Sequence, residues 1–143
     1  MSKLGIGIIG CGNISTAYLT LAPLFKGIEV RAVADINPSA AQEKADEFNV
    51  RAQSVKDLLG ADDIDVVVNL TVPAAHFSTT KTILQAGKHA YSEKPLVLSL
   101  KEGKELTALA AENGLRVGSA PDTFLGGAHQ QARALIDQGA LGN

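Results

Sequence analysis

The chain has 143 residues, of which 45% are hydrophobic and 20% charged, and its formal net charge is −2. This length fits one domain and is too short for a two-domain enzyme. No stretch reaches the roughly 18 consecutive apolar residues that a membrane span needs. The 13 Lys and Arg residues are spread along the chain. The basic patch typical of nucleic-acid and membrane-surface binders is therefore absent, which excludes those classes of partner.

The only cysteine is Cys11, so the chain cannot form an internal disulfide. No Cys and His cluster offers the ligand set of a structural zinc site, and we expect no metal. A reducing, cytoplasmic location is the expectation that follows.

Short β-rich runs alternate with longer runs at helical spacing, and this rhythm predicts βα units around a parallel sheet. Strands are expected near Leu4 to Ile9, Glu29 to Asp35, Val50 to Ala52, Asp65 to Thr71, His89 to Glu93 and Arg116 to Ala120. Helices are expected near Ile14 to Lys26, Pro38 to Phe48, Val55 to Leu59, Ala74 to Ala86, Leu100 to Asn113 and Gly126 to Gln138.

Residues at the element boundaries support this division. Asn37 before Pro38 is an N-cap followed by proline at the first helical position. Ser99 with Glu102 has the pattern of a capping box. The run of valines after Asp65 is continuous, as expected for a central parallel strand that is buried on both faces. Four glycines can take the left-handed conformation that ends a helix: Gly60, Gly87, Gly114 and Gly139.

Two overlapping G-x-G-x-x-G patterns occur near the N-terminus. The literal match runs from Gly5 to Gly10, but it lies inside the apolar run expected to be the first strand. A phosphate-binding loop follows the strand and opens a helix. We therefore favour the pattern that begins at Gly10 and ends at Ser15.

In this second pattern Gly10 permits the tight turn, Gly12 lets the backbone approach a pyrophosphate, and Ser15 takes the small-residue packing position. The helix start at Asn13 and Ile14 then presents free N–H groups to phosphates. A tight turn without a ligand is the alternative interpretation. Cys11 is interpreted as a small apolar filler of the loop rather than as a reactive thiol.

Asp35 ends the second expected strand, 25 residues after Gly10, which is close to the spacing of the acid that binds the adenosine ribose. With Ile36, it is predicted to contact the cofactor. A 2′-phosphate about 4 Å away would be repelled by roughly 4 kcal/mol per charge pair at an effective dielectric constant of 20. No Arg or Lys lies in the next four residues, so the sequence favours NAD over NADP.

Two later segments complete the pattern: Thr71-Val72-Pro73-Ala74-Ala75-His76, and Ala86-Gly87-Lys88-His89 followed by Glu93-Lys94-Pro95. With the glycine loop and in this order, they resemble the N-terminal domain of the Gfo/Idh/MocA oxidoreductases, the family of glucose-fructose oxidoreductase and inositol dehydrogenase. The resemblance runs from about Lys3 to Gly142. It implies a Rossmann-type, doubly wound, three-layer α/β fold that binds NAD(P) over residues 1–143, followed in the family by a substrate domain that is missing here.

The resemblance also implies a reaction. Family members move a hydride between the nicotinamide and a secondary alcohol of a sugar, cyclitol or related polyol. Lys94 matches the family's lysine near the nicotinamide ribose and the reacting hydroxyl, where an ammonium could stabilise an alkoxide or relay a proton. Glu93 is expected to shape the loop or contact cofactor, and Pro95 to fix the backbone behind Lys94.

Thr71 and Pro73 are predicted to line the cofactor, with the end of a strand as the alternative. His76 is open between a cofactor contact and a helix cap, whereas His89 is interpreted as structural. Three aspartates precede a buried strand at the sheet edge opposite the carboxyl ends, so a catalytic role is not expected for them: Asp62, Asp63 and Asp65.

The last segment departs from many relatives, which carry an Arg- or Tyr-containing stretch there. Asp122, Thr123 and Phe124 could face substrate, and the roles of Asp122, Thr123 and His129 stay open. In the family, the turn from Gly139 to Gly142 leads into the substrate domain, so the chain is expected to end at a domain boundary.

The sequence thus predicts an NAD-binding domain whose isolated chain binds cofactor with little turnover. Two other hypotheses stay open, a non-catalytic NAD-sensing regulator and a structural remnant without ligand. The expected partners are the dinucleotide and, in the complete protein, a small polyol or sugar-like substrate. Self-association into a homo-oligomer is compatible with the sequence.

Overall fold

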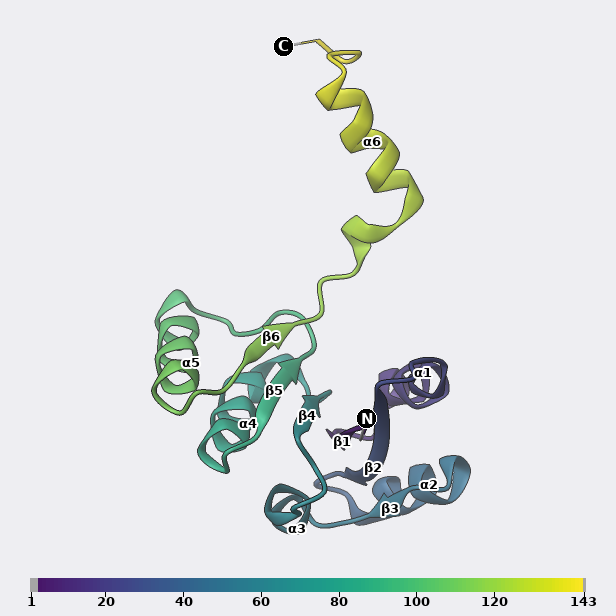
Figure 1. The fold of residues 1–143 in the computed structure, drawn as a ribbon, viewed down its shortest axis with the longest axis vertical. Coiled ribbons are helices and arrows are strands. Elements are labelled where there is room, and N and C mark those ends of the chain that lie inside the picture. Colours follow the sequence, from purple (N-terminus) through teal and green to yellow (C-terminus); the bar gives the residue numbers. More distant parts are fainter. Residues whose placement is uncertain (1–2, 143) are drawn as a thin grey trace.

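The computed structural model describes residues 3–142, which form a six-stranded parallel sheet with helices on both faces (Figure 1). The strand order is β3-β2-β1-β4-β5-β6. The strands are β1 (Leu4–Ile9), β2 (Ile28–Ala34), β3 (Arg51–Ala52), β4 (Val66–Asn69), β5 (His89–Ser92) and β6 (Val117–Ser119). The α-helices are α1 (Asn13–Leu21), α2 (Pro38–Phe48), α3 (Val55–Gly60), α4 (Pro73–Gln85), α5 (Leu100–Glu112) and α6 (Gly127–Asp137), with short 3₁₀ turns η1 (Ala22–Leu24) and η2 (Thr123–Leu125). The predicted α/β, doubly wound class is confirmed.

The sheet separates two apolar cores, because successive strand residues point to opposite faces. On one face, Ile6 and Ile8 of β1 pack with Leu19 of α1 and the alanines of α2. On the other face, α3, α4 and α5 supply leucines and isoleucines against Ile9 and Val67. Val67 and Val68 of β4 are buried between β1 and β5, as a central strand requires, and Val66 is half-buried.

Most of the predicted helix signals are present. The Asn37 side chain accepts from the Ser39 N–H, and Ser99 with Glu102 forms the capping box. Gly87, Gly114 and Gly139 have positive φ, as predicted. The prediction for Gly60 was wrong.

Gly60 is the last residue of α3, and extended Ala61 follows it as the cap. The chain therefore leaves that helix without a left-handed residue. Asn49 instead takes the left-handed position after α2, with φ of 53°. Asparagine tolerates this conformation best among residues with a Cβ atom.

The first helix is shorter than predicted and the last helix is isolated. Pro23 lies within η1, where α1 gives way to the tighter turn, because proline has no N–H for an α-helical bond. Helix α6 extends away from the sheet, connected through η2, and none of its residues is buried (Figure 1). None of the helices within residues 3–142 combines the length and apolar character that crossing a bilayer requires.

The strand order reverses direction between β1 and β4, which are hydrogen-bonded neighbours with their carboxyl ends at the same edge. In open α/β sheets, ligands bind at such a switch point, outside the carboxyl ends of the strands. The loops after β1, β2, β4 and β5 meet at this edge.

Candidate cofactor-binding site

The loop after β1 contains two glycines, Gly10 and Gly12, and glycine occupies the two positions for different reasons. Gly10 has φ of 105°, and a Cβ there would lie 2.6 Å from the carbonyl carbon and oxygen of Leu70. Only glycine fits where the loop crosses the end of β4. Among the described residues, no heavy atom lies within 4 Å of a Cβ placed on Gly12. Gly12 therefore leaves open space above the loop, and the protein fold alone does not require it.

Helix α1 begins directly after Gly12, and Asn13 and Ile14 in its first turn are exposed. Within residues 3–142, no side chain caps this helix. Its first N–H groups are consequently open to a ligand, and the positive end of the helix dipole favours an anion there. The literal glycine pattern from Gly5 to Gly10 instead begins within β1.

Two small residues fill the space beneath the loop. Ser15 is fully buried and its hydroxyl donates to the Gly12 carbonyl over 2.6 Å. Cys11 is buried, with its thiol 3.5 Å from the Ala34 carbonyl. Burial, reinforced by the charge of Asp35, raises the pKa of the Cys11 thiol to about 11. Such a thiol is largely protonated at neutral pH and is a weak nucleophile.

Asp35 follows β2 and its carboxylate is held by two backbone groups. Oδ2 accepts from the Cys11 N–H over 2.7 Å, and Oδ1 accepts from the Asn37 N–H over 2.8 Å. A carboxylate oxygen has a second lone pair, so both oxygens can also accept from hydroxyl groups. Ile36 beside it is 99% exposed. The structure therefore brings Asp35 to the glycine loop in a fixed orientation.

A cleft of about 600 Å³ opens beside Asp35. Its walls come from the glycine loop, from Asp35 and Ile36, and from Thr71 and Val72 after β4. Ser78 and Thr79 of α4 also line it. The cleft thus joins predicted cofactor residues from three separate loops. Pro73, the first residue of α4, is exposed next to Val72.

A second cleft, of about 590 Å³, runs beside α1 along the sheet face, from Leu4 and Val66 at the starts of β1 and β4 to Glu93 after β5. Its lining is mostly apolar and includes Ile14, Tyr18, Tyr91 and Glu93. The Tyr18 hydroxyl donates to Glu93 Oε1 over 2.9 Å. Burial and this hydrogen bond raise the pKa of Tyr18.

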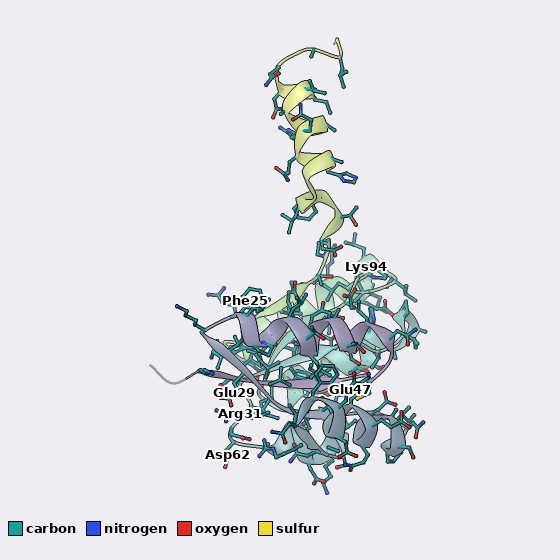
Figure 2. All side chains as sticks on the ribbon, turned by 90° about the vertical axis from the view of Figure 1, so that its right-hand side faces the viewer. Phe25, Glu29, Arg31, Glu47, Asp62 and Lys94 are labelled. Atoms are coloured by element: carbon teal, nitrogen blue, oxygen red, sulfur yellow. The ribbon has the colours of Figure 1, made fainter. Side chains whose placement is uncertain are left out.

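Glu93 is held at both carboxylate oxygens. While Oε1 accepts from Tyr18, Oε2 accepts from the Lys94 backbone N–H over 3.0 Å. The Lys94 side chain itself is exposed. Figure 2 shows Lys94 on the opposite side of the domain from Asp62. Glu93 therefore orients the backbone at Lys94, and the sequence pattern contained no signal for Tyr18 in this arrangement.

Asn69, at the end of β4, is a polar residue that the sequence interpretation missed. Its side chain is fully buried, donates to the His76 carbonyl and the Thr80 hydroxyl, and accepts from the Thr71 N–H and hydroxyl. The signal was available, because a polar amide that ends a run of buried valines must find partners. Asn69 thereby ties the loop after β4 to the start of α4.

His76 lies inside the same network. Its side chain is 1% exposed, with Nε2 2.9 Å from the Thr71 carbonyl oxygen and Nδ1 2.5 Å from the Pro95 carbonyl oxygen. The structure thus places this residue behind the two loops rather than on the surface of either cleft. Neither sequence alternative, a helix cap or a direct cofactor contact, describes this position.

The remaining candidates lie away from the clefts or at their rim. Asp63 pairs with Arg51, whose guanidinium lowers the pKa of that carboxyl, and Asp65 accepts from the Gly5 N–H. His89 Nδ1 accepts from the Arg116 N–H between β5 and β6, a structural contact.

Among the last candidates, Asp122 lines the apolar cleft, at the rim formed by the segment after β6. Thr123 and Phe124 belong to the exposed turn η2, and His129 lies on the isolated helix α6. The clefts therefore bring together predicted residues from the glycine loop and from the loops after β2, β4 and β5. The candidates that line neither cleft include Pro73, His76, Lys94 and His129.

Comparison with known proteins assigns the family. A sequence model described as "Oxidoreductase family, NAD-binding Rossmann fold" matches residues 4–120, which include every strand and the glycine loop. The chain belongs to the Gfo/Idh/MocA oxidoreductase family. The resemblance stated from the sequence motifs is confirmed, and the domain is the NAD-binding Rossmann domain of this family.

Eight curated relatives share 25 to 33% identity with this domain. The 1,5-anhydro-D-fructose reductase of Ensifer adhaerens is 29% identical over 95% of the chain and 41% of its own length. Inositol 2-dehydrogenase of Salmonella paratyphi B is 30% identical over 97% of the chain and 43% of its own length. The chain therefore spans less than half the length of these relatives.

Solved structures show the same fold. A point mutant of a 3-ketoreductase from Actinomadura kijaniata in complex with TDP-benzene and NADP has a TM-score of 0.90 at 28% identity, covering 99% of the chain and 44% of the reductase. Biliverdin reductase from Synechocystis in complex with biliverdin and NADP⁺ has a TM-score of 0.87 at 29% identity, covering 95% and 43%. A nicotinamide dinucleotide is thus the cofactor class of this Gfo/Idh/MocA domain.

The loop geometry fits this cofactor class. A side chain on Gly12 would occupy the open space above the first turn of α1, where a pyrophosphate needs direct access to the backbone. The carboxylate of Asp35 faces the neighbouring cleft with lone pairs available for hydroxyl groups. The open space at Gly12 and the free lone pairs of Asp35 are both expected for a dinucleotide site, whereas a turn without a ligand requires neither.

Proposed function

We propose that this domain binds NAD and takes part in hydride transfer to or from a secondary alcohol of a sugar, cyclitol or related polyol. The observation that carries the proposal is the convergence of the glycine loop, Asp35 and Thr71 on one cleft at the switch point. Glu93, which precedes the exposed Lys94, lines a second cleft. Because the chain spans under half of its relatives, the reaction is proposed for a protein in which this domain works with a substrate-binding part.

The two clefts suggest how the dinucleotide would be held. Asp35 and Ile36 would bind the adenosine ribose in the cleft beside β2, and Thr71 would line the same cleft, with the exposed Pro73 at its edge. The backbone from Gly10 to Ile14 would bind the pyrophosphate through N–H groups. The nicotinamide end would then reach the loop that carries Lys94.

The cofactor, when bound, supplies the hydride acceptor or donor. Lys94 would hydrogen-bond the reacting hydroxyl and stabilise the negative charge that develops on its oxygen. Glu93, held by Tyr18, would fix the backbone from which the Lys94 side chain extends. The buried thiol of Cys11 takes no part, and its position suits a reducing compartment such as the cytoplasm.

The names of the relatives support the substrate class. They include an inositol dehydrogenase, a reductase of 1,5-anhydro-D-fructose and, from Streptomyces violaceoruber at 33% identity, a reductase of a dTDP-linked dideoxy sugar. These names cover one cyclitol and two sugar derivatives. A panel of cyclitols and hexoses is therefore the first choice of substrates for the protein.

The preference for NAD is the finer part of the proposal. Asp35 lies where a 2′-phosphate would approach, and Ile36, Asn37 and Pro38 offer no positive charge. Repulsion across about 4 Å amounts to roughly 4 kcal/mol per charge pair at an effective dielectric constant of 20, before screening by salt. Calorimetric titration with both dinucleotides tests the preference, and tighter binding of NADP contradicts it.

The Gly12→Ala variant tests the binding site itself. The open space around Gly12 accommodates a methyl group, so this variant is expected to fold with unchanged thermal stability. Its Kd for NAD should rise at least tenfold, because the methyl group keeps the pyrophosphate from the backbone. A wild-type chain that binds no NAD in calorimetry would refute the proposed function and favour a structural role for the loop.

A further inference from the structure

The ring of His76 bridges the loops that follow two neighbouring strands. Nε2 faces the Thr71 carbonyl after β4, and Nδ1 faces the Pro95 carbonyl after β5. The two bridged residues, Thr71 and Pro95, are 24 residues apart in the sequence. A single buried side chain thus contacts both.

The chemistry of the bridge is restrictive. A carbonyl oxygen accepts hydrogen bonds but cannot donate them, so each contact is a hydrogen bond only when the facing ring nitrogen carries a proton. One nitrogen donates in a neutral imidazole, and both donate in an imidazolium. The ring is 1% exposed, so no competing water replaces these carbonyl partners at the surface.

The position of the ring is itself determined by its neighbours. The backbone carbonyl of His76 accepts from the Asn69 side chain, whose oxygen accepts from the Thr71 N–H and hydroxyl. The backbone that carries the ring is therefore already connected to the loop after β4 through Asn69. It contributes the connection from that loop to Pro95, directly behind Lys94.

We propose that His76 is a positioning residue that couples the adenosine side of the cofactor site, at Thr71, to the nicotinamide side, at Lys94. Its ring is buried and lines neither cleft. Its two contacts set the separation of the loops, so that a dinucleotide meets both at once. The ligand-binding experiments below rest on the proposed function, because they require that the domain binds NAD.

Two single substitutions at His76 each remove one of the two ring contacts and keep the other. In His76→Gln the amide nitrogen can occupy the position of ring Nε2 and keep the bond to Thr71, whereas the contact with Pro95 is lost. In His76→Asn the amide nitrogen can occupy the position of Nδ1 and keep the bond to Pro95. Thr80→Val is the matched control, since Thr80 is equally buried in the network but reaches neither loop.

Calorimetry with NAD and ADP-ribose reads the two sides separately, because ADP-ribose lacks the nicotinamide. His76→Gln should weaken NAD binding about tenfold, which corresponds to about 1.4 kcal/mol, and leave ADP-ribose within twofold. His76→Asn should weaken both ligands by similar factors. Thr80→Val should lower the Tm and change the affinity ratio of the two ligands by less than twofold.

Amide hydrogen exchange without ligand provides the second readout. Exchange should accelerate at residues 93–97 in His76→Gln and at residues 71–72 in His76→Asn. If both variants change both loops equally, or match Thr80→Val, His76 is only a structural residue and the inference fails. If the wild type binds neither ligand while the exchange pattern is as expected, the proposed function fails and the coupling stands.

Discussion

The two halves of the cofactor edge are built in different ways. After β1 and β2, the loops are stabilised by backbone geometry and by bonds between Asp35 and backbone N–H groups. After β4 and β5, the loops are stabilised by buried side chains, above all Asn69 and His76. The first half therefore depends on glycine conformations and one acid, whereas the second depends on a network of polar groups that must all be satisfied.

In both halves the residues that stabilise the loops differ from the residues that are open to a ligand, but the two groups are arranged differently. In the first half, two glycines separated by one residue have different roles, since the fold requires Gly10 and Gly12 keeps the space above the loop open. In the second half, the residues that stabilise the loops are buried behind them, and the residues offered to a ligand, such as Lys94, are exposed. Substitutions can therefore distinguish the halves.

Gly10→Ala should have the largest effect. The methyl group would meet the Leu70 carbonyl at 2.6 Å and also force an alanine to φ of 105°. We expect the free energy of unfolding to fall by about 3 kcal/mol. Urea unfolding monitored by circular dichroism measures this loss. The matched Gly12→Ala variant should unfold like the wild type, and equal destabilisation of both would contradict the division of duties.

Asn69→Leu should have the second largest effect and tests the other half. The substitution removes every partner that the Asn69 side chain provides to Thr71, Thr80 and the first turn of α4. We expect a loss of about 2 to 3 kcal/mol in the free energy of unfolding, since buried polar groups are left unpaired. The same urea experiment measures it, and a change below 0.5 kcal/mol, the scale of ordinary surface substitutions, would show that the network is dispensable.

Asp35→Asn should act mainly on the choice of cofactor. The amide oxygen can keep one backbone bond, so the fold is expected to persist with a modest loss of stability. The Kd for NAD should rise about tenfold, while the ratio of NAD to NADP affinity moves toward one because the repulsive charge is gone. Parallel titrations with the two dinucleotides give the ratio, and an unchanged ratio would remove Asp35 from cofactor discrimination.

Lys94→Ala should leave stability within about 0.5 kcal/mol of the wild type, since the side chain is exposed. Binding of ADP-ribose should be unchanged and NAD binding only a few-fold weaker, whereas turnover in the complete protein should be lost. Unchanged turnover with polyol substrates would favour a cofactor-sensing role over catalysis.

The smallest expected effect concerns pH. The pKa of the Cys11 thiol is raised from 9.0 to about 11 by burial, so the folded state keeps a proton that the unfolded state releases. This contribution to stability is complete below pH 9 and is lost as the pH rises toward 11. Cys11→Ser should reduce the fall in Tm between pH 9 and pH 11. A fall as steep as in the wild type would assign alkaline sensitivity to other groups, including Tyr18, whose pKa is also raised.

The order of the elements, the register of the glycine loop and the acid after β2 could be predicted from the sequence because their signals are local. Capping by Asn37 and Ser99 acts over three residues, and the valines of β4 identify a buried strand directly. The same locality explains the error at Gly60, since glycine permits a left-handed residue without requiring one. Asn49 carried that role after α2 instead.

The tertiary structure alone decided which groups meet across long stretches of chain. Tyr18 and Glu93 are 75 residues apart, and Gly10 is required because of Leu70, which a local pattern cannot show. From the sequence, the role of His76 could be limited only to a helix cap or a cofactor contact. Its actual contact depends on the position of the Pro95 carbonyl, which follows the next strand of the sheet. The sequence by itself therefore determined the fold and the cofactor class, and packing at the switch point decided how the two halves of the site are joined.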